Sequence, residues 1–72
     1  MTETRPHETE ALKADPIGKF FAYGHLPEHL RVVSAPFAEL AAFILKLPGS
    51  AERTVAMRKL LESKDAAVRA AL

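Results

Sequence analysis

A lysine on the apolar face of a predicted helix is the residue of this sequence with the clearest chemical potential. Helical spacing puts Lys64 in the middle of the face that the apolar residues of the C-terminal third would form. Those apolar residues are Met57, Leu60, Val68 and Ala71. A buried, unpaired ammonium is costly, so the head of Lys64 must reach water, a carboxylate or an anion. It is either a side chain that runs along apolar surface to water or to a neighbouring subunit's carboxylate, or a phosphate ligand in a pocket at a subunit interface.

Three other basic residues lie in the same segment: Arg58, Lys59 and Arg69. Arg58 and Arg69 each have a carboxylate four residues away, Glu62 and Asp65, which is typical of a solvated helix face. An arginine can instead bind a phosphate through two N–H groups and stack its plane on a base. Lys59 and Arg69 therefore remain candidate phosphate ligands.

Aromatic residues gather in the segment 17–26, where Phe20, Phe21 and Tyr23 lie close together. Such residues either belong to the core or form a recognition surface. Tyr23 stands between alanine and Gly24, which leaves room for a flat group to stack on its ring.

Two histidines, His25 and His29, have a spacing that metal sites use, but Pro27 lies between them and no third ligand is apparent. We therefore expect no metal, and we interpret His25 as a candidate donor to a ligand oxygen. Catalysis is not expected either, because the sequence has no cysteine, no phosphate-binding glycine motif and no nucleophile elbow. The sequence predicts a binding protein that needs no cofactor.

The elements that must position these residues are helices. Residues 1–13 are acidic with few apolar anchors, and we expect them to be disordered or loosely attached. Residues 14–72 are predicted to form one helical hairpin domain, with an extended aromatic arm over 17–26, a helix kinked at Pro36 over 27–47 and a second helix over 51–71. The first helix has an apolar stripe at Leu30, Val33, Phe37, Leu40, Ile44 and Leu47. Ser50 can cap the second helix, and the short loop predicts an antiparallel all-α fold.

Two helices in a chain of 72 residues, 49% of them hydrophobic, cannot cover all their apolar surface. A second apolar strip of the first helix, formed by Val32, Pro36 and Phe43, is therefore expected to pair with another copy of the chain. The net charge of +1, with acids among the bases, argues against DNA or RNA as a partner. No apolar run reaches the length of a membrane span, and the polar start is no secretory signal, so we expect a cytoplasmic protein.

Five short motifs in order resemble a known group of proteins. They are FAYGHLP (21–27), FAELAAFI (37–44), PGSAERT (48–54), AMRKLLE (56–62) and KDAAVRA (64–70). Over about residues 21–70 the chain is similar to the helical-hairpin domain of small phage proteins that sequester cyclic-nucleotide immune signals. The best-known members are anti-CBASS sponges, and related hairpins occur in anti-Thoeris sponges.

The resemblance implies a compact homo-oligomer, hexameric in known relatives, in the cytoplasm of the infected bacterial host. It implies binding of cyclic di- or trinucleotides between subunits without cleavage. Tyr23 corresponds to an arm tyrosine that stacks on a base, and basic side chains of the helices take the phosphates.

This sequence departs from the resemblance at Ala38, which aligns with a helix-one lysine of relatives. The phosphate contact must then come from Arg31, earlier in the same predicted helix, or from Lys59, Lys64 or Arg69. An alternative function is an oligomeric helical adaptor that docks on a host or phage protein through the strip of Val32, Pro36 and Phe43.

Overall fold

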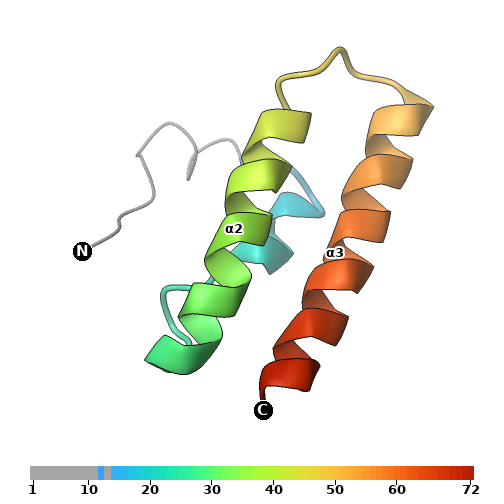
Figure 1. Ribbon diagram of the computed structural model, residues 1–72. Coiled ribbons are helices and arrows are strands. Elements are labelled where there is room, and N and C mark those ends of the chain that lie inside the picture. The colour runs from blue at the N-terminus through green and yellow to red at the C-terminus, as the bar shows by residue number, and fades with distance from the viewer. Residues whose placement is uncertain (1–11, 13) are drawn as a thin grey trace.

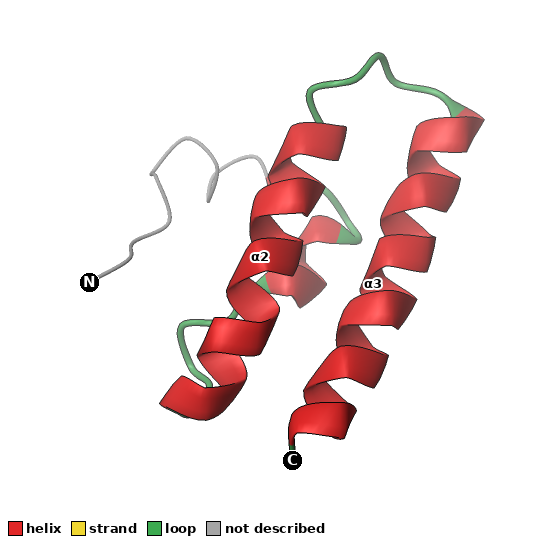
Figure 2. Cartoon of the chain, viewed as in Figure 1, coloured by secondary structure: helices red, strands yellow, loops and turns green. Residues whose placement is uncertain are grey.

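Two long helices lie side by side and are joined by one short loop (Figures 1 and 2). The computed structural model describes residues 12 and 14–72 of the chain. The elements are a short 3-10 helix η1 (Gly18–Phe21), then α2 (Glu28–Ile44) and α3 (Ala51–Ala71). No strand occurs in these residues, so the predicted all-α class is confirmed, with two helices that pack together.

The first long helix is shorter than predicted. It begins after Pro27, whose carbonyl accepts from the N–H groups of Leu30 and Arg31 at 2.9 Å, and it runs through Pro36 to Ile44. The prediction of a helix to residue 47 is wrong because the chain tightens there. The N–H of Lys46 donates to the carbonyl of Phe43, and that of Leu47 to Ile44, each at 3.0 Å, which is the i to i−3 pattern of a closing turn.

The start of α3 is fastened to the end of α2 by one side chain. Ser50 caps α3 as predicted, because its Oγ accepts from the backbone N–H of Arg53 at 3.0 Å. The Nη1 of Arg53 then donates to the carbonyls of Leu45 at 3.2 Å and Leu47 at 3.0 Å. Both carbonyls lie in the turn just after α2, at the negative end of its dipole, so the cation of Arg53 stabilises the hairpin loop.

The buried face of α2 is built largely from small side chains. The buried residues of this helix are Leu30, Ser34, Ala38, Ala41 and Ala42. The predicted stripe of large residues is therefore wrong in part, since Leu40 and Leu47 are exposed and Phe37 and Ile44 are only partly buried. Small side chains let neighbouring elements approach α2 closely, and Phe21 and Met57 fill the space that remains.

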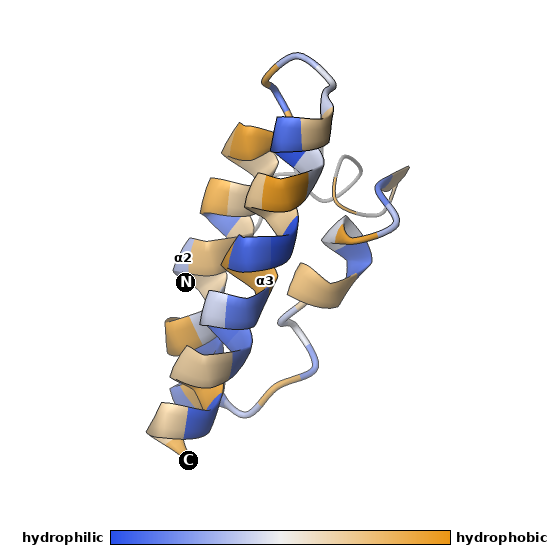
Figure 3. Cartoon of the chain, turned by 90° about the vertical axis from the view of Figure 1, so that its right-hand side faces the viewer, coloured by the Kyte–Doolittle hydropathy of each residue, from blue (hydrophilic) through white to orange (hydrophobic). Residues whose placement is uncertain are grey.

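The sequence predicted an extended aromatic arm over 17–26, but the segment is not extended throughout. Its residues Gly18–Phe21 form η1, which packs against both α2 and α3. Figure 3 shows this segment on one side of the helix pair. Oδ1 of Asp15 accepts from the N–H groups of Ile17 at 2.8 Å and Gly18 at 3.0 Å, so a side chain just before the segment starts the turn.

Leu12 corrects the expectation for the N-terminus. The sequence assigned it to the loosely attached segment 1–13, yet it is 6% exposed and belongs to the core cluster. Residues 1–11 and 13, on which the rest of that expectation falls, lie outside the described residues.

Large apolar side chains also lie on the surface. Val32, Pro36 and Phe43, the strip expected to pair with another copy, are all exposed. Leu40, Leu47 and Val55 are exposed as well. Neither α2 nor α3 is long and apolar enough to cross a membrane, which is the finding for the described part of the chain.

Gly18 is expected to be required for the contact between η1 and Leu12. A Cβ added at Gly18 would meet the backbone carbonyl of Leu12 and lie 3.0 Å from its Cα, whereas a Cβ at Gly24 meets nothing within 4 Å. We predict that Gly18→Ala lowers the free energy of unfolding by about 1–3 kcal/mol, because the obstacle is backbone. Gly24→Ala, the matched control, should leave it unchanged or raise it by up to about 1 kcal/mol. Urea unfolding followed by circular dichroism measures both, and equal effects of the two changes would contradict the prediction.

Candidate functional site

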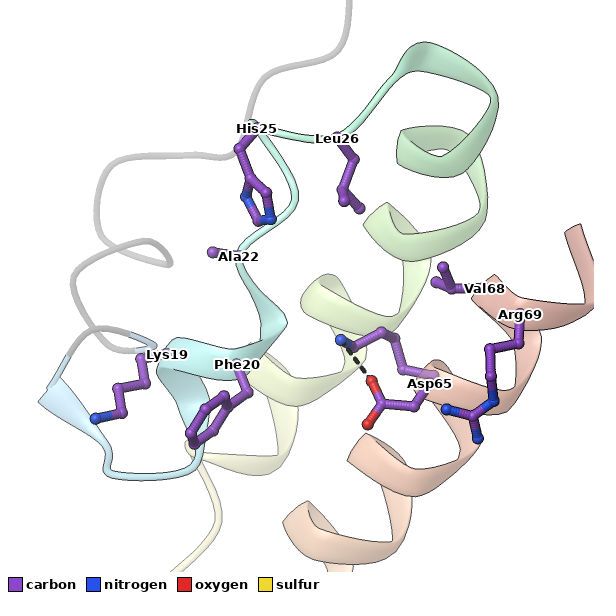
Figure 4. A pocket seen from close by; sticks show the side chains of 9 residues that line it. Lys19, Phe20, Ala22, His25, Leu26, Asp65, Val68 and Arg69 are labelled. Carbon is purple, nitrogen blue, oxygen red and sulfur yellow. Dashed lines mark ion pairs between the residues drawn. The ribbon is translucent and has the colours of Figure 1, made fainter. Parts of the chain in front are cut away.

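A pocket of about 360 Å³ opens between η1, the segment that follows it, and the C-terminal half of α3 (Figure 4). Its lining residues come from two stretches far apart in the sequence. They are Lys19, Phe20, Ala22, His25 and Leu26 on one side and Lys64, Asp65, Val68 and Arg69 on the other. The pocket thus exists only because η1 is held against the helix pair.

Each wall follows from its local backbone. In η1, Phe21 turns into the core and is 0% exposed, so its neighbour Phe20 is directed outward and is 56% exposed. After η1, the N–H of Leu26 donates to the carbonyl of Tyr23 at 3.1 Å, and this turn brings His25 and Leu26 to the pocket. On α3, positions 64, 65, 68 and 69 lie on one side of the helix, since residues four apart are neighbours.

Lys64 lies largely covered in the pocket wall. Its side chain is 13% exposed, and its Nζ is 2.8 Å from Oδ1 of Asp65, whose side chain is 45% exposed. The dashed line in Figure 4 marks this ion pair. The ammonium of Lys64 is therefore paired with a carboxylate, one of the three partners that we expected for a lysine on an apolar face. This carboxylate belongs to the same helix, α3.

Arg69 does not make the ion pair that its spacing from Asp65 suggested. Asp65 pairs with Lys64 instead, and in the described part of the chain no ion pair joins Asp65 to Arg69. Arg69 is exposed and lines the pocket, so its guanidinium is available to a bound anion.

Lys19 is a pocket residue that the sequence reasoning missed. Its Nζ lies 5.4 Å from the centroid of the Phe20 ring, so a cation and an aromatic face are held together at the pocket edge. Its position beside Phe20 in the aromatic segment was a signal that could have found it.

The electrostatic character of the lining is positive. Its described residues include three cationic side chains, those of Lys19, Lys64 and Arg69, one carboxylate, that of Asp65, and the imidazole of His25. The rest of the lining is apolar, formed by Phe20, Ala22, Leu26 and Val68. A pocket with several cations and an exposed aromatic ring suits an anion that also has a flat apolar part.

The structure brings three of the six predicted site residues to this pocket: His25, Lys64 and Arg69. Tyr23 is partly buried and packs against the core cluster, and it does not line the pocket. Arg31 and Lys59 are exposed and do not line it either. Ala38, where the resemblance places a lysine, is 2% exposed in the core, so α2 offers no cation there.

None of the described residues that line the pocket has a hydroxyl or thiol side chain. Among the described residues, no group of three or more histidine, cysteine, aspartate or glutamate side chains could hold a metal ion. The chemistry that this arrangement supports is ionic binding combined with stacking.

Comparison with protein-family models, curated proteins and solved structures found no match to this chain. The geometry of the pocket and the sequence resemblance are therefore the two grounds for a function.

The adjacent residues Phe20 and Phe21 should contribute very differently to the stability of the fold. We predict that Phe21→Ala lowers the free energy of unfolding by about 3–5 kcal/mol, because a fully buried ring leaves a cavity. Phe20→Ala should change it by less than about 0.5 kcal/mol, because that ring is mostly in water. Thermal and urea unfolding provide the measurement, with Phe21→Leu as a milder variant. A loss for Phe20→Ala as large as that for Phe21→Ala would show that the outward ring is structural.

Proposed function

We propose that this protein binds a cyclic di- or trinucleotide second messenger of bacterial anti-phage signalling and holds it without cleavage, as a phage immune-evasion protein. The observation that carries the proposal is the pocket, whose described lining combines three cationic side chains with an exposed aromatic one. The resemblance of residues 21–70 to cyclic-nucleotide sponges names the class of ligand.

The pocket supplies what each part of a nucleotide needs. A phosphodiester takes charge-assisted hydrogen bonds from Lys64 and from the two-pronged guanidinium of Arg69. Lys64 is the stronger electrostatic contributor because its side chain is largely covered, where salt screens less than at an open surface. A base stacks on Phe20, which takes the place that the resemblance gives to Tyr23.

The size of the pocket favours a site completed by a second subunit. At about 360 Å³ it is at the small end of the range for ligand sites. A cyclic dinucleotide therefore needs a further wall beyond this chain. The exposed Val32, Leu40 and Phe43 support self-association that would supply it, in a homo-oligomer such as the hexamer that the resemblance implies.

Binding without cleavage is supported by the composition of the pocket. No hydroxyl or thiol side chain of the described residues lines it as a nucleophile, and the carboxylate of Asp65 in the lining is paired with Lys64. A protein of this kind acts by lowering the concentration of free signal, so its effect depends on affinity and on its copy number.

The exposed strip of Val32, Pro36 and Phe43 also favours a second candidate, a helical adaptor for a host or phage protein. The two functions differ in what is isolated with the protein. A sponge expressed beside an active signal synthase carries a nucleotide, whereas an adaptor carries a stoichiometric protein partner and no nucleotide.

Two lysines of α3 give a matched test of the pocket. Lys64 lines it, whereas Lys59 is exposed on the same helix outside it, and each change to methionine removes one positive charge. We predict that Lys64→Met weakens binding of cyclic dinucleotides about ten- to hundredfold, because a charged hydrogen bond is lost. Lys59→Met should change it by less than about twofold, since exposed charges outside the site are screened.

Isothermal titration calorimetry measures these affinities, and mass spectrometry of the supernatant after heat denaturation tests for release of intact ligand. Release of a hydrolysed product would refute storage without cleavage. Absence of any thermal shift or heat with a panel of cyclic di- and trinucleotides would refute the proposed function.

A further inference from the structure

We propose that Asp65 makes the pocket selective for phosphodiesters over terminal phosphate monoesters. This inference rests on the proposed function, because it concerns the same site and the class of phosphate that the site accepts. It assigns a role in specificity to a carboxylate that stands in a pocket otherwise suited to anions.

The position of Asp65 is fixed by its contact with Lys64. Oδ1 of Asp65 is 2.8 Å from Nζ of Lys64, and both residues line the pocket. Any phosphate oxygen that binds the ammonium of Lys64 therefore comes to rest beside a negative carboxylate. The remaining N–H donors of that ammonium still serve one phosphate oxygen, since a lysine has three.

The ion pair gives the ammonium of Lys64, whose side chain is only 13% exposed, a negative partner when no ligand is bound. Asp65 itself is 45% exposed, so its carboxylate remains open to a molecule in the pocket. The helical spacing favours a different pair, Asp65 with Arg69, but Asp65 is engaged by Lys64. Because Asp65 pairs with Lys64, Arg69 is left for the ligand. The carboxylate of Asp65 also lies directly beside Lys64, the most covered cation among the described lining residues.

The charge of the ligand decides how strongly Asp65 acts on it. A phosphodiester has one negative charge, whereas a terminal phosphate monoester has between one and a half and two near neutral pH. The cations of the pocket attract the monoester more strongly, and repulsion from Asp65 also grows with ligand charge. Asp65 therefore reduces the stronger attraction that the cations would otherwise have for linear nucleotides with a terminal phosphate. The pocket would then discriminate between ligands through repulsion.

Glu62 offers a matched control for this carboxylate. It is exposed on α3 and does not line the pocket, and Glu62→Gln raises the net charge by one unit just as Asp65→Asn does. The comparison separates a local contact from a general increase in positive charge.

The test measures the affinities of four probes for the full chain and the two variants by calorimetry. The probes are cyclic di-AMP and cyclic di-GMP, and their linear 5′-phosphorylated forms pApA and pGpG, in which water has opened one diester to a monoester. Differences in preorganisation between cyclic and linear forms cancel when each ratio of affinities is compared between variants. We expect Asp65→Asn to strengthen binding of the linear forms about threefold more than binding of the cyclic forms. Glu62→Gln should leave the ratio unchanged.

An unchanged cyclic-to-linear ratio in Asp65→Asn, with binding retained, overturns the role of Asp65 and leaves the proposed function intact. An equal change of the ratio in Glu62→Gln also overturns it, because the effect would then come from overall charge. If none of the four probes nor any cyclic trinucleotide binds the wild type or Asp65→Asn, the proposed function fails and this proposal fails with it.

Discussion

The burial of Phe21 is the contact on which the rest of the structure depends. Its side chain is fully enclosed where η1, α2 and α3 meet, and it belongs to one core cluster with Met57 and with Ala38 and Ala41 of α2. Burying a phenylalanine stabilises a fold by roughly 1.5–3 kcal/mol, a large share of the stability of so short a chain. The same contact holds η1 against the helix pair, so the energy that stabilises the core also builds one wall of the pocket.

The 3-10 turn explains how neighbouring residues of the same type take opposite roles. Asp15 binds the N–H groups of Ile17 and Gly18, and the turn that follows directs Phe21 inward and Phe20 outward. An extended segment would also alternate its side chains, but it would not bring Lys19 over the ring of Phe20 at the pocket edge. Local hydrogen bonds to one carboxylate thus set the geometry of the candidate site.

Patterns along the sequence predicted the parts of the fold that depend on local chemistry. The hairpin, the Ser50 cap and the unusual setting of Lys64 follow from spacing and residue type, and the structure confirms them. The buried face of α2 could not be predicted in the same way, because hydropathy favours large residues such as Leu40, whereas the close approach of η1 favours alanine. Leu12 was missed because an isolated apolar residue in an acidic segment has no periodic signal. Lys19 has only its neighbour Phe20 as a signal in the sequence, because the pocket itself forms through the tertiary contact of η1 with α3.

The location of the positive charge follows from the way the core is built. Ala38, Ala41 and Ala42 are buried where α2 packs closely against its neighbours. A lysine at position 38 would bury an unpaired ammonium, so this face of α2 cannot supply a phosphate ligand. The side of α3 that lines the pocket has no such restriction, and Lys64 and Arg69 lie there. A covered lysine still needs a negative partner when no ligand is bound, and Asp65 provides one at 2.8 Å. That partner must then be displaced or tolerated by an incoming phosphate, so the residue that makes the free pocket stable also sets how much negative charge the pocket accepts.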